Sequence, residues 1–356
     1  MSWTAVSPAR RTRPDHADYE RLIMRVLVTG GAGFIGSNFV DRVIRGTYPA
    51  LAGAEVVVLD KLTYAGNLEN LADVAADPRF RFVHGDVTDA PLVRDAMDGV
   101  DLVVHFAAES HVDRSIEEGA EFVRTNVLGT QVLLQCALDA RVGRFVHVST
   151  DEVYGSIAAG SFSEADPLRP NSPYSASKAA SDLLALAYHR THGLDVRVTR
   201  CSNNYGPYQF PEKVIPLFVT NLADGLPVPL YGDGRNVRDW LHVDDHCDGI
   251  ALVAESGRAG DVYNIGGGTE LSNRELTGML LETMGADWSS VRPVPDRKGH
   301  DFRYSVDIGK IQRELGYTPR VRFGEGLAAT VRWYLDNRDW WKPLKGYEPA
   351  EGAQSC

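Results

Sequence analysis

Short apolar runs alternate with amphipathic stretches along the chain as far as about residue 201. The apolar, β-branched runs predict buried strands at residues 25–30, 54–60, 79–86, 100–108, 143–150 and 194–201. Apolar residues at helical spacing predict helices between them, most clearly at residues 34–45, 121–138 and 173–193. Strands buried on both faces and separated by helices are typical of a parallel sheet that helices cover on two sides. We therefore predict an α/β fold with a doubly wound parallel sheet.

This alternation weakens after residue 201, where loops rich in Gly, Pro, Asn and Asp surround a weaker helical pattern at residues 273–285. The change predicts a smaller C-terminal lobe. The N-terminal residues include several arginines but lack the apolar segment of a signal peptide. We expect a disordered extension (1–23), a nucleotide-binding domain (24–200) with a returning segment near 236–265, a mainly substrate-binding lobe (201–345) and a tail (346–356).

Composition narrows the possible partners. The chain is 44% hydrophobic and 24% charged, which is ordinary for a globular protein, and its formal net charge is −11. A negative balance argues against a nucleic-acid partner, because binding phosphate backbones requires a basic surface. No apolar run has the length of a membrane span. The scattered cysteines, Cys136, Cys201, Cys247 and Cys356, suit neither a disulfide framework nor a zinc site, so we predict a cytoplasmic protein with reduced thiols.

The sequence GGAGFIG, residues 30–36, joins the first predicted strand to the first predicted helix. It can be read as G-x-G-x-x-G on Gly31, Gly33 and Gly36, or as G-x-x-G-x-x-G on Gly30, Gly33 and Gly36. Without Cβ atoms the chain can turn tightly, and the helix N-terminus can approach a pyrophosphate. Alone the pattern could be a plain tight turn, but between a strand and a helix it predicts a dinucleotide site.

Carboxylates follow the next two predicted strands. Asp60 ends the second strand, where a carboxylate can bind the ribose hydroxyls of the adenosine and would repel a 2′-phosphate. The cofactor predicted is therefore NAD rather than NADP; the alternative for Asp60 is a helix cap or a turn residue. Asp86 ends the third strand and is expected near the adenine. The sequence FAAESH, residues 106–111, ends the fourth strand and would run beneath the cofactor.

The sequence PYSASK places Tyr174 and Lys178 four residues apart, on one face of a predicted helix that Asn171 or Ser172 can cap. A nearby ammonium and a positively charged nicotinamide favour the phenolate of Tyr174. Such a phenolate can take a proton from a hydroxyl while hydride leaves the same carbon. After a dinucleotide motif, this pair predicts a dehydrogenase-type site.

Thr150, Asp151 and Glu152 stand at the carboxyl end of the fifth strand, where parallel sheets bind ligands. Oxidation of an alcohol needs one hydroxyl there, which Thr150 supplies. Two further acids suggest a second task, the elimination of water next to the carbonyl that hydride transfer creates. The acids could instead cap the following turn or pair with arginines, and their spacing does not decide between these interpretations.

Together these motifs resemble the extended short-chain dehydrogenase/reductase family, also called NAD-dependent epimerases and dehydratases. The resemblance runs from about residue 24 to residue 345 and includes TGGAGFIG, DKLTYAGN, HFAAESHVDRS, STDEVYG, PYSASKAASD, NNYGPYQFPEK, GRNVRDWLHVDDH, YNIGGG and DRKGHDFRYSVD. TDEVYG is the most specific and is similar to the sugar-nucleotide 4,6-dehydratases that act on dTDP-glucose. The 4-epimerases of the family lack the Asp-Glu pair, and GDP-mannose 4,6-dehydratases typically keep only the glutamate.

The resemblance implies a Rossmann fold, NAD as cofactor, dTDP-glucose as substrate and a homodimer. Tyr174 would take the C4 hydroxyl proton, Lys178 would tune Tyr174 and hold the nicotinamide ribose, and Thr150 would bind the C4 oxygen. Glu152 would remove the C5 hydrogen, and Asp151 would protonate the leaving C6 hydroxyl. The hydride then returns to C6, which gives a 4-keto-6-deoxy sugar nucleotide.

The remaining contacts are also implied by the resemblance. The NAD contacts, besides Tyr174 and Lys178, would be Gly30, Gly33, Phe34, Ile35, Gly36, Asp60, Lys61, Leu62, Thr63, Asp86, Val87, Ala107, Ala108, Ser110, Thr125 and Asn204. The substrate contacts, besides Thr150, would be His111, Asn203, Lys213, Pro229, Tyr231, Arg238, Asn273, Arg297 and His300. The cations of this set suit a diphosphate. Without the resemblance, each would read better as a solvated surface charge.

Three other functions compete with dehydration. A sugar-nucleotide 4-epimerase would leave Asp151 and Glu152 without a task. A non-catalytic NAD-sensing regulator could lose Tyr174 or Lys178, and both are present. A purely structural role would leave the glycine motif unexplained. His242 and His246 have the spacing of a metal-binding pair on a helix, but no third ligand is evident, so we predict capping or packing for them and no metal site.

Overall fold

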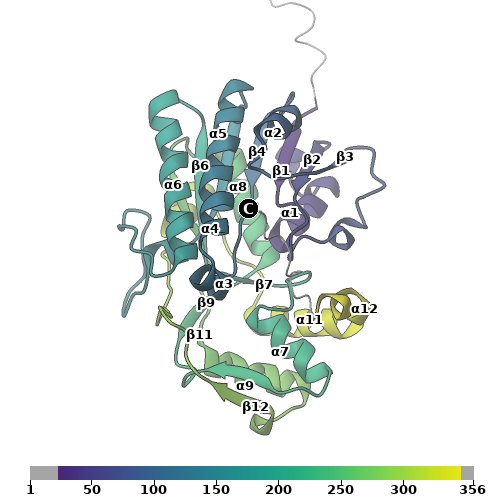
Figure 1. Cartoon of the computed structure of the whole chain (residues 1–356), viewed down its shortest axis with the longest axis vertical. Helices are drawn as coiled ribbons and strands as arrows, with labels where there is room; N and C mark the ends of the chain where they lie inside the picture. The colour runs from purple at the N-terminus through teal and green to yellow at the C-terminus, as the bar shows by residue number, and fades with distance from the viewer. Residues whose placement is uncertain (1–22, 346–356) are drawn as a thin grey trace, which may run out of the picture.

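The computed structural model describes residues 23–345 and divides them into two lobes, one above the other in Figure 1. The predicted tail at 346–356, and the predicted extension apart from Ile23, lie outside the described residues. Within residues 23–345, no helix is long and apolar enough to cross a membrane.

The larger lobe contains a seven-stranded sheet in the order β10-β6-β5-β4-β1-β2-β3, and every neighbouring pair is parallel. This arrangement confirms the predicted doubly wound α/β fold. The order steps outward in both directions from the neighbours β1 and β4, which places a crevice at their carboxyl ends. The strands are β1 (Arg25–Thr29), β2 (Glu55–Asp60), β3 (Phe80–His84), β4 (Leu102–His105), β5 (Arg144–Thr150), β6 (Val196–Cys201) and β10 (Val262–Ile265).

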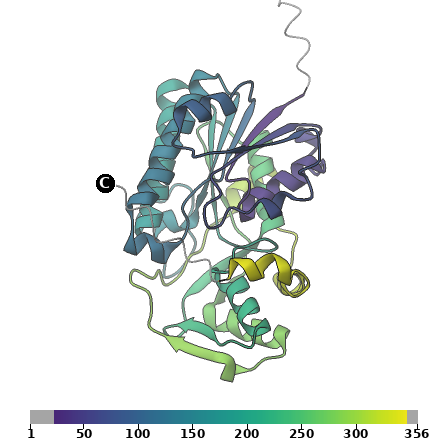
Figure 2. The ribbon, with the colours of Figure 1, turned by 45° about the vertical axis from the view of Figure 1, so that its right-hand side comes forward.

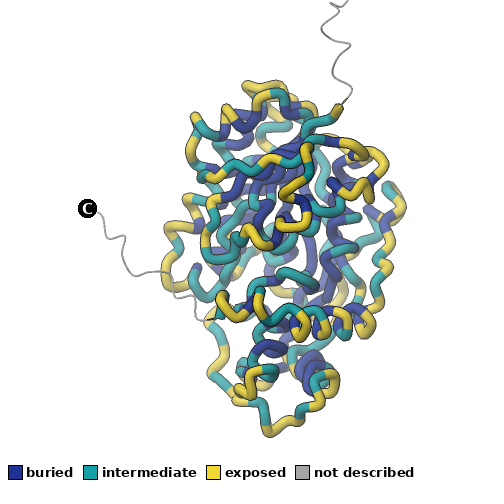
Figure 3. The backbone as a smooth tube through the Cα atoms, turned by 90° about the vertical axis from the view of Figure 1, so that its right-hand side faces the viewer, coloured by how far each residue is buried: buried dark blue, intermediate teal, exposed yellow. Residues whose placement is uncertain are grey.

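Helices cover both faces of this sheet (Figure 2). Alternation along β1 divides the core, since Val26 and Val28 pack on one face and Leu27 on the other. The first face is covered by α1 (Phe34–Ile44), α8 (Val243–Ser256) and α10 (Gly309–Leu315), and the second by α2 (Ala90–Ala96), α5 (Thr130–Asp139) and α6 (Pro173–His192). Buried backbone accordingly runs through the middle of the lobe in Figure 3, with exposed segments around it.

The helix predicted at 121–138 is not a single α-helix. It consists of α4 (Ala120–Phe122), a π-helical segment η4 (Val123–Gly129) and α5. The wider turn contains the buried Asn126, whose side-chain amide bonds the backbone of Glu109 and the hydroxyl of Ser177. These partners are distant in sequence, so the apolar periodicity that predicted the helix contains no sign of the π-helical turn.

The smaller lobe is built from segments that follow β6. Its sheets are β11-β9-β7 and β12-β8, and its core includes Tyr205, Trp240, Phe323, Tyr334 and Trp341. Its strands are β7 (Asn203–Tyr205), β8 (Val228–Tyr231), β9 (Val237–His242), β11 (Glu270–Ser272) and β12 (Val291–Val294). Its helices are α7 (Val214–Ala223), α9 (Asn273–Met284), α11 (Phe323–Asp336) and α12 (Arg338–Trp341). Between these elements the chain returns to the larger lobe as α8 and β10, and later as α10.

Candidate active site

The glycine turn after β1 brings three backbone segments into close contact. Gly30 has a φ of +69°, and a Cβ there would lie 2.6 Å from the backbone nitrogen of Ala107. A Cβ on Gly36 would lie 2.3 Å from the carbonyl oxygen of Gly30. Gly31 instead faces the side chain of Val58 in β2. The structure therefore favours the reading on Gly30, Gly33 and Gly36, which leaves the start of α1 open to a pyrophosphate.

Asp60 organises the same turn. Its Oδ2 accepts a hydrogen bond from the Ala32 N–H at 2.9 Å, and its Oδ1 accepts one from the Leu62 N–H at 2.8 Å. Burial raises the pKa of this carboxyl, and the two backbone bonds oppose the rise. Asp60 thus has the turn-capping role that the sequence left open, and it also lines the cavity described next.

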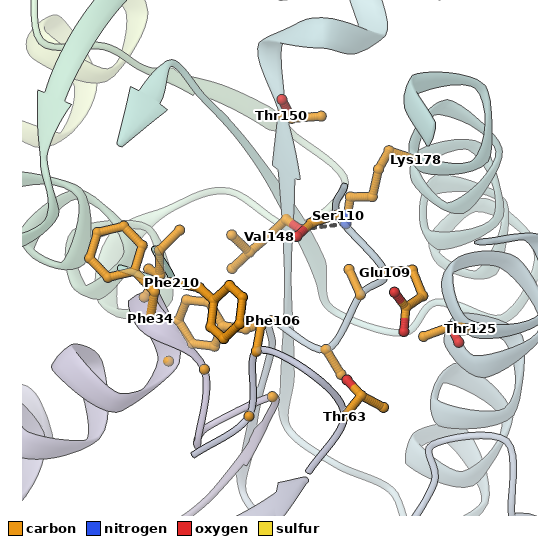
Figure 4. A pocket seen from close by; sticks show the side chains of 18 of the residues that line it. Phe34, Thr63, Phe106, Glu109, Ser110, Thr125, Val148, Thr150, Lys178 and Phe210 are labelled. Carbon is orange, nitrogen blue, oxygen red and sulfur yellow. Dashed lines mark hydrogen bonds between the residues drawn. The ribbon is translucent and has the colours of Figure 1, made fainter. Parts of the chain in front are cut away.

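One cavity of about 330 Å³ follows the carboxyl ends of the central strands (Figure 4). It joins the predicted catalytic residues to almost all of the predicted cofactor contacts. The cofactor contacts in its lining, besides Tyr174 and Lys178, are Gly30, Gly33, Phe34, Ile35, Gly36, Asp60, Lys61, Thr63, Asp86, Val87, Ala107, Ala108, Ser110, Thr125 and Asn204. Leu62 is not in the lining, because its N–H turns back to Asp60 and its side chain packs toward the core behind α1.

Thr150, Asp151 and Glu152 line the same cavity at the end of β5. Asp151 is only 2% exposed, and its Oδ2 has no hydrogen-bond partner. Burial, followed by the charge of Glu152, raises the pKa of Asp151 well above its ordinary value. Burial also raises the pKa of Glu152, while the charges of Arg238 and Lys213 oppose the rise. The neighbouring acids therefore differ in environment, since Asp151 holds a proton more readily and cations stabilise ionised Glu152.

Tyr174 and Lys178 enter the cavity from the first turns of α6. Ser172 is the N-cap and forms a capping box with Ser175, so of the two expected capping residues Ser172 takes that role. The Lys178 Nζ donates to the carbonyl oxygen of Val148 at 2.8 Å (Figure 4), and burial lowers the pKa of Lys178 to about 8. Burial and the charge of Glu152 raise the pKa of Tyr174 well above its ordinary value. The favoured phenolate expected from the sequence is thus not a property of the chain alone.

The predicted diphosphate cations gather around Glu152, although their segments lie far apart in sequence. Lys213 lines the cavity with Asn203 and donates to the carbonyl oxygen of Ser110 at 3.1 Å. The charges of Arg238, Lys213 and Arg297 all act on Glu152. Arg297 also lies over the ring of Tyr231, 5.4 Å from its centroid, and that ring meets His300 edge-on. These substrate-side predictions therefore form one region.

Internal acids pair with this cationic region. The Arg297 Nη2 donates to Asp113 at 3.1 Å, and the Arg114 Nη2 donates to Glu212 at 3.2 Å. Neither acid was predicted, although Glu212 lines the cavity directly before Lys213 in sequence. Phe106 and Glu109 line the cavity within the FAAESH segment expected beneath the cofactor, whereas the lining residues Gln209 and Phe210 were not predicted. The YQFPEK motif contains Gln209 and Phe210 and could have supplied the signal.

The other predicted substrate contacts lie outside the cavity lining. They are His111, Pro229, Tyr231, Arg238, Asn273, Arg297 and His300. His111 caps α3 (Val112–Glu117), and Asn273 begins α9, where its N–H donates to the carbonyl oxygen of Asn236. Their placement against a sugar nucleotide stays a prediction.

The histidine pair of α8 has structural contacts. His242 is the N-cap and accepts from the Asp244 N–H, while the Nδ1 of His246 lies 2.9 Å from the side-chain oxygen of Asn204. Capping and packing were the roles predicted for them. Among the described residues, no group of three or more His, Cys, Asp or Glu side chains could hold a metal ion.

Comparison with known proteins gives consistent relatives. The model of the GDP-mannose 4,6 dehydratase family matches residues 27–330. A dTDP-glucose 4,6-dehydratase from Streptomyces niveus is 63% identical over 330 residues, which cover 93% of this chain and 98% of that protein. The crystal structure of DesIV, a dTDP-glucose 4,6-dehydratase from Streptomyces venezuelae with NAD and TYD bound, is 70% identical with a TM-score of 0.90, and covers 90% of this chain and 100% of that one.

A more distant solved structure shows how widely the fold is shared. UDP-glucose 4-epimerase from Thermotoga maritima is 33% identical with a TM-score of 0.81, over 88% of this chain and 99% of that one. Fold similarity alone therefore does not separate dehydration from epimerisation. The family match and the high-identity relatives confirm the resemblance drawn from the motifs: the chain belongs to the GDP-mannose 4,6-dehydratase family, within the extended short-chain dehydrogenases/reductases.

Proposed function

We propose that the chain is an NAD-dependent dTDP-glucose 4,6-dehydratase, a hydro-lyase of deoxysugar synthesis. The observation that carries this proposal is the pair of buried Asp151 and half-buried Glu152 at the end of β5, in the cavity that Tyr174 and Lys178 also line. An epimerase of the same fold needs the tyrosine and lysine but has no use for two acids with raised pKa values.

The cofactor side of the cavity suits NAD. The glycine turn packs so closely that a Cβ on Gly36 would meet the Gly30 carbonyl oxygen, and Asp60 lies where it would repel a 2′-phosphate. When bound, NAD+ supplies a hydride acceptor for C4 and later a donor for C6. NAD is a bound ligand of the relatives DesIV and the dTDP-glucose 4,6-dehydratase of Bacillus anthracis.

The proposed roles follow the different environments of the side chains. Tyr174 takes the proton of the C4 hydroxyl, Lys178 contributes positive charge beside it, and Thr150 orients the C4 oxygen. The resulting ketone acidifies C5, from which Glu152 removes the proton. Asp151 holds a proton more readily and gives it to the C6 oxygen, so one water leaves. Hydride return to C6 and proton return to C5 complete the 4-keto-6-deoxy product.

The test is to incubate the purified protein with dTDP-glucose in deuterated water, without added NAD, and to analyse the product by mass spectrometry and NMR. If the protein is a dehydratase, the product has lost one water and carries deuterium at C5. An unchanged sugar, or one inverted only at C4, would contradict the proposal. UDP-glucose and GDP-mannose, tested in parallel, define the nucleotide and hexose preference.

We further propose a homodimer through η4 and α6. Val123 and Leu128 of η4 and Leu183 of α6 are 57%, 49% and 60% exposed, on segments that pack side by side. Exposed apolar residues on neighbouring segments are typical of an interface between copies. Light scattering should give twice the monomer mass, and Leu183→Glu should shift it toward the monomer. A monomeric mass for the unsubstituted protein would contradict this arrangement.

The expected compartment is the cytoplasm. Cys136, Cys201 and Cys247 are free and buried, which is consistent with a reducing environment. Cell fractionation, with a periplasmic and a cytoplasmic marker enzyme, tests this expectation.

A further inference from the structure

The loop between β12 and α10 is tied to the catalytic helix by one buried acid, Asp301. Asp301 is 5% exposed, and its Oδ1 accepts a hydrogen bond from the Nδ2 of Asn171 at 2.5 Å. Its Oδ2 accepts one from the Tyr304 hydroxyl at 2.6 Å, and its backbone carbonyl accepts one from Arg238 at 2.9 Å. Asp301 therefore connects the loop that carries Arg297 and His300 both to the residue before the N-cap of α6 and to Arg238.

Asn171 stands next to the start of α6. It directly precedes the N-cap Ser172, whose capping box with Ser175 fixes the first turn of the helix. Tyr174 is the second residue of that helix. A displacement of the Asn171 side chain would therefore shift Ser172 and the first turn of α6, which contains Tyr174.

Hydrogen bonds, rather than apolar packing, hold the loop at this point. A second cavity, of about 390 Å³, is lined by Ser156, Asn171, Gly299, His300, Asp301 and Phe302. Phe302 is itself 55% exposed, so it does not anchor the loop in a core. A loop held in this way depends strongly on each buried polar contact.

The contact between Asp301 and Tyr304 also supports Arg238, whose charge acts on Glu152. Arg238 lies 4.2 Å from the centroid of the Tyr304 ring, and the Tyr304 hydroxyl donates to Asp301. Asp301 also adds negative charge near Glu152. Asp301 is thus placed to act on the substrate cations and on the acid–base residues.

We propose that Asp301 is a positioning residue whose bond to Asn171 locks the loop of Arg297 and His300 against the start of α6. Through this bond, binding of the diphosphate by the loop is coupled to the alignment of Tyr174 at the start of α6. This inference rests on the proposed function, because it assigns the loop to the sugar nucleotide. Asp301 itself takes part in no bond making or breaking.

The test exchanges the two partners. Asn171→Asp places two carboxylates against each other and should break the lock, whereas Asn171→Asp with Asp301→Asn restores a donor and an acceptor. With NAD-loaded protein, Asn171→Asp should weaken dTDP binding, measured by calorimetry, by roughly tenfold and lower kcat for dTDP-glucose to a similar extent. The double variant should recover most of both losses.

Ser156→Ala is the matched control. The Ser156 Oγ accepts from the N–H groups of Phe302 and Arg303, so it ties the same loop to the segment after Glu152 but not to α6. This variant should raise KM without lowering kcat. NAD content and the melting temperature, measured for every variant, separate positioning from folding.

Two results would overturn the proposal. One is a double variant as impaired as Asn171→Asp, and the other is a double variant that regains thermal stability but neither dTDP affinity nor kcat. If the unsubstituted protein fails to dehydrate dTDP-glucose, the proposed function fails instead. The dTDP-binding series would then still decide whether Asp301 and Asn171 form the lock.

Discussion

The cofactor side and the substrate side of the cavity are held together by different contacts. On the cofactor side, Gly30, Gly36 and the loop at Ala107 meet backbone to backbone, at distances that exclude even one additional carbon. On the substrate side, charged side chains from separate segments meet as pairs, such as Arg297 with Asp113 and Arg114 with Glu212. Close packing of backbone atoms therefore fixes the shape of the cofactor side, whereas ion pairs between side chains hold the substrate side together.

This difference indicates how each side responds to its ligand. Close-packed backbone has almost no freedom to adjust, so the cofactor side should bind NAD in the shape it already has. On the substrate side, Arg297 pairs with Asp113 and Lys213 lies beside Glu212, so a diphosphate must compete with these two acids. We expect substitutions on the cofactor side to weaken NAD binding through steric clashes, and those on the substrate side to alter dTDP binding through changes of charge.

The largest expected effect lies where the two sides meet. Glu152→Gln removes the base but preserves the shape of the side chain, so turnover of dTDP-glucose should fall by roughly 10²- to 10⁴-fold, as is typical of a lost acid–base group. NAD content should not change. The measurement combines product formation with deuterium exchange at C5. An equal loss of NAD would instead make Glu152 part of the cofactor side.

Gly36→Ala tests the rigidity of the cofactor side. Its Cβ would lie 2.3 Å from the Gly30 carbonyl oxygen, and overpacking of this kind costs about 1–3 kcal/mol. We expect NAD to bind roughly ten- to hundredfold more weakly, as measured by titration of the apoprotein. Gly324→Ala in α11 is the control, because a Cβ there meets nothing within 4 Å. Unchanged NAD affinity of Gly36→Ala would show that this turn can adjust.

Asp151→Asn tests whether the buried Asp151 carboxyl destabilises the folded protein when it is ionised. The pKa of Asp151 is higher in the folded chain than in the unfolded chain, so folding favours its protonated form. The free energy of unfolding therefore decreases as the pH rises from the ordinary pKa of Asp to the raised one, and asparagine lacks this decrease. The melting temperature of the variant, relative to the unsubstituted protein, should increase between pH 4 and pH 8 by about 2–4 °C. A difference that does not depend on pH would contradict the raised pKa.

Asp113→Asn should have the smallest effect and tests the charge balance of the substrate side. It releases Arg297 from a partly exposed ion pair, for which about 0.2–1 kcal/mol is typical. We expect dTDP to bind up to about fivefold more tightly, with the gain decreasing at high salt. Asp233→Asn, which releases the exposed Arg235 on the same lobe, is the control. Weaker dTDP binding would make Asp113 part of the binding site rather than a competitor.

The contrast also explains what could be predicted from sequence. Local patterns predicted the glycine turn, the Tyr174–Lys178 pair and the acids after β5. The periodicity of the flanking strands and helices placed each of these motifs at the end of a strand or the start of a helix. The sequence did not indicate that the Leu62 side chain packs toward the core, at a positive φ of 53°, while its neighbours Lys61 and Thr63 line the cavity. The π-helical turn at Asn126 and the bond between Asn171 and Asp301 depend on partners far along the chain. No local pattern contains them, so only the folded structure reveals them.

The late return of the chain to the first sheet has a consequence for biosynthesis. The core behind α1 combines residues of β1 with Ile250 of α8, Ile265 of β10 and Tyr317. A nascent chain that has emerged only as far as β6 has one face of its sheet incompletely covered and lacks the edge strand β10. The nucleotide-binding lobe therefore cannot complete its folding on the ribosome until most of the smaller lobe has been translated. For the same reason, a gene fragment ending after β6 should yield an aggregating polypeptide rather than an isolated NAD-binding module.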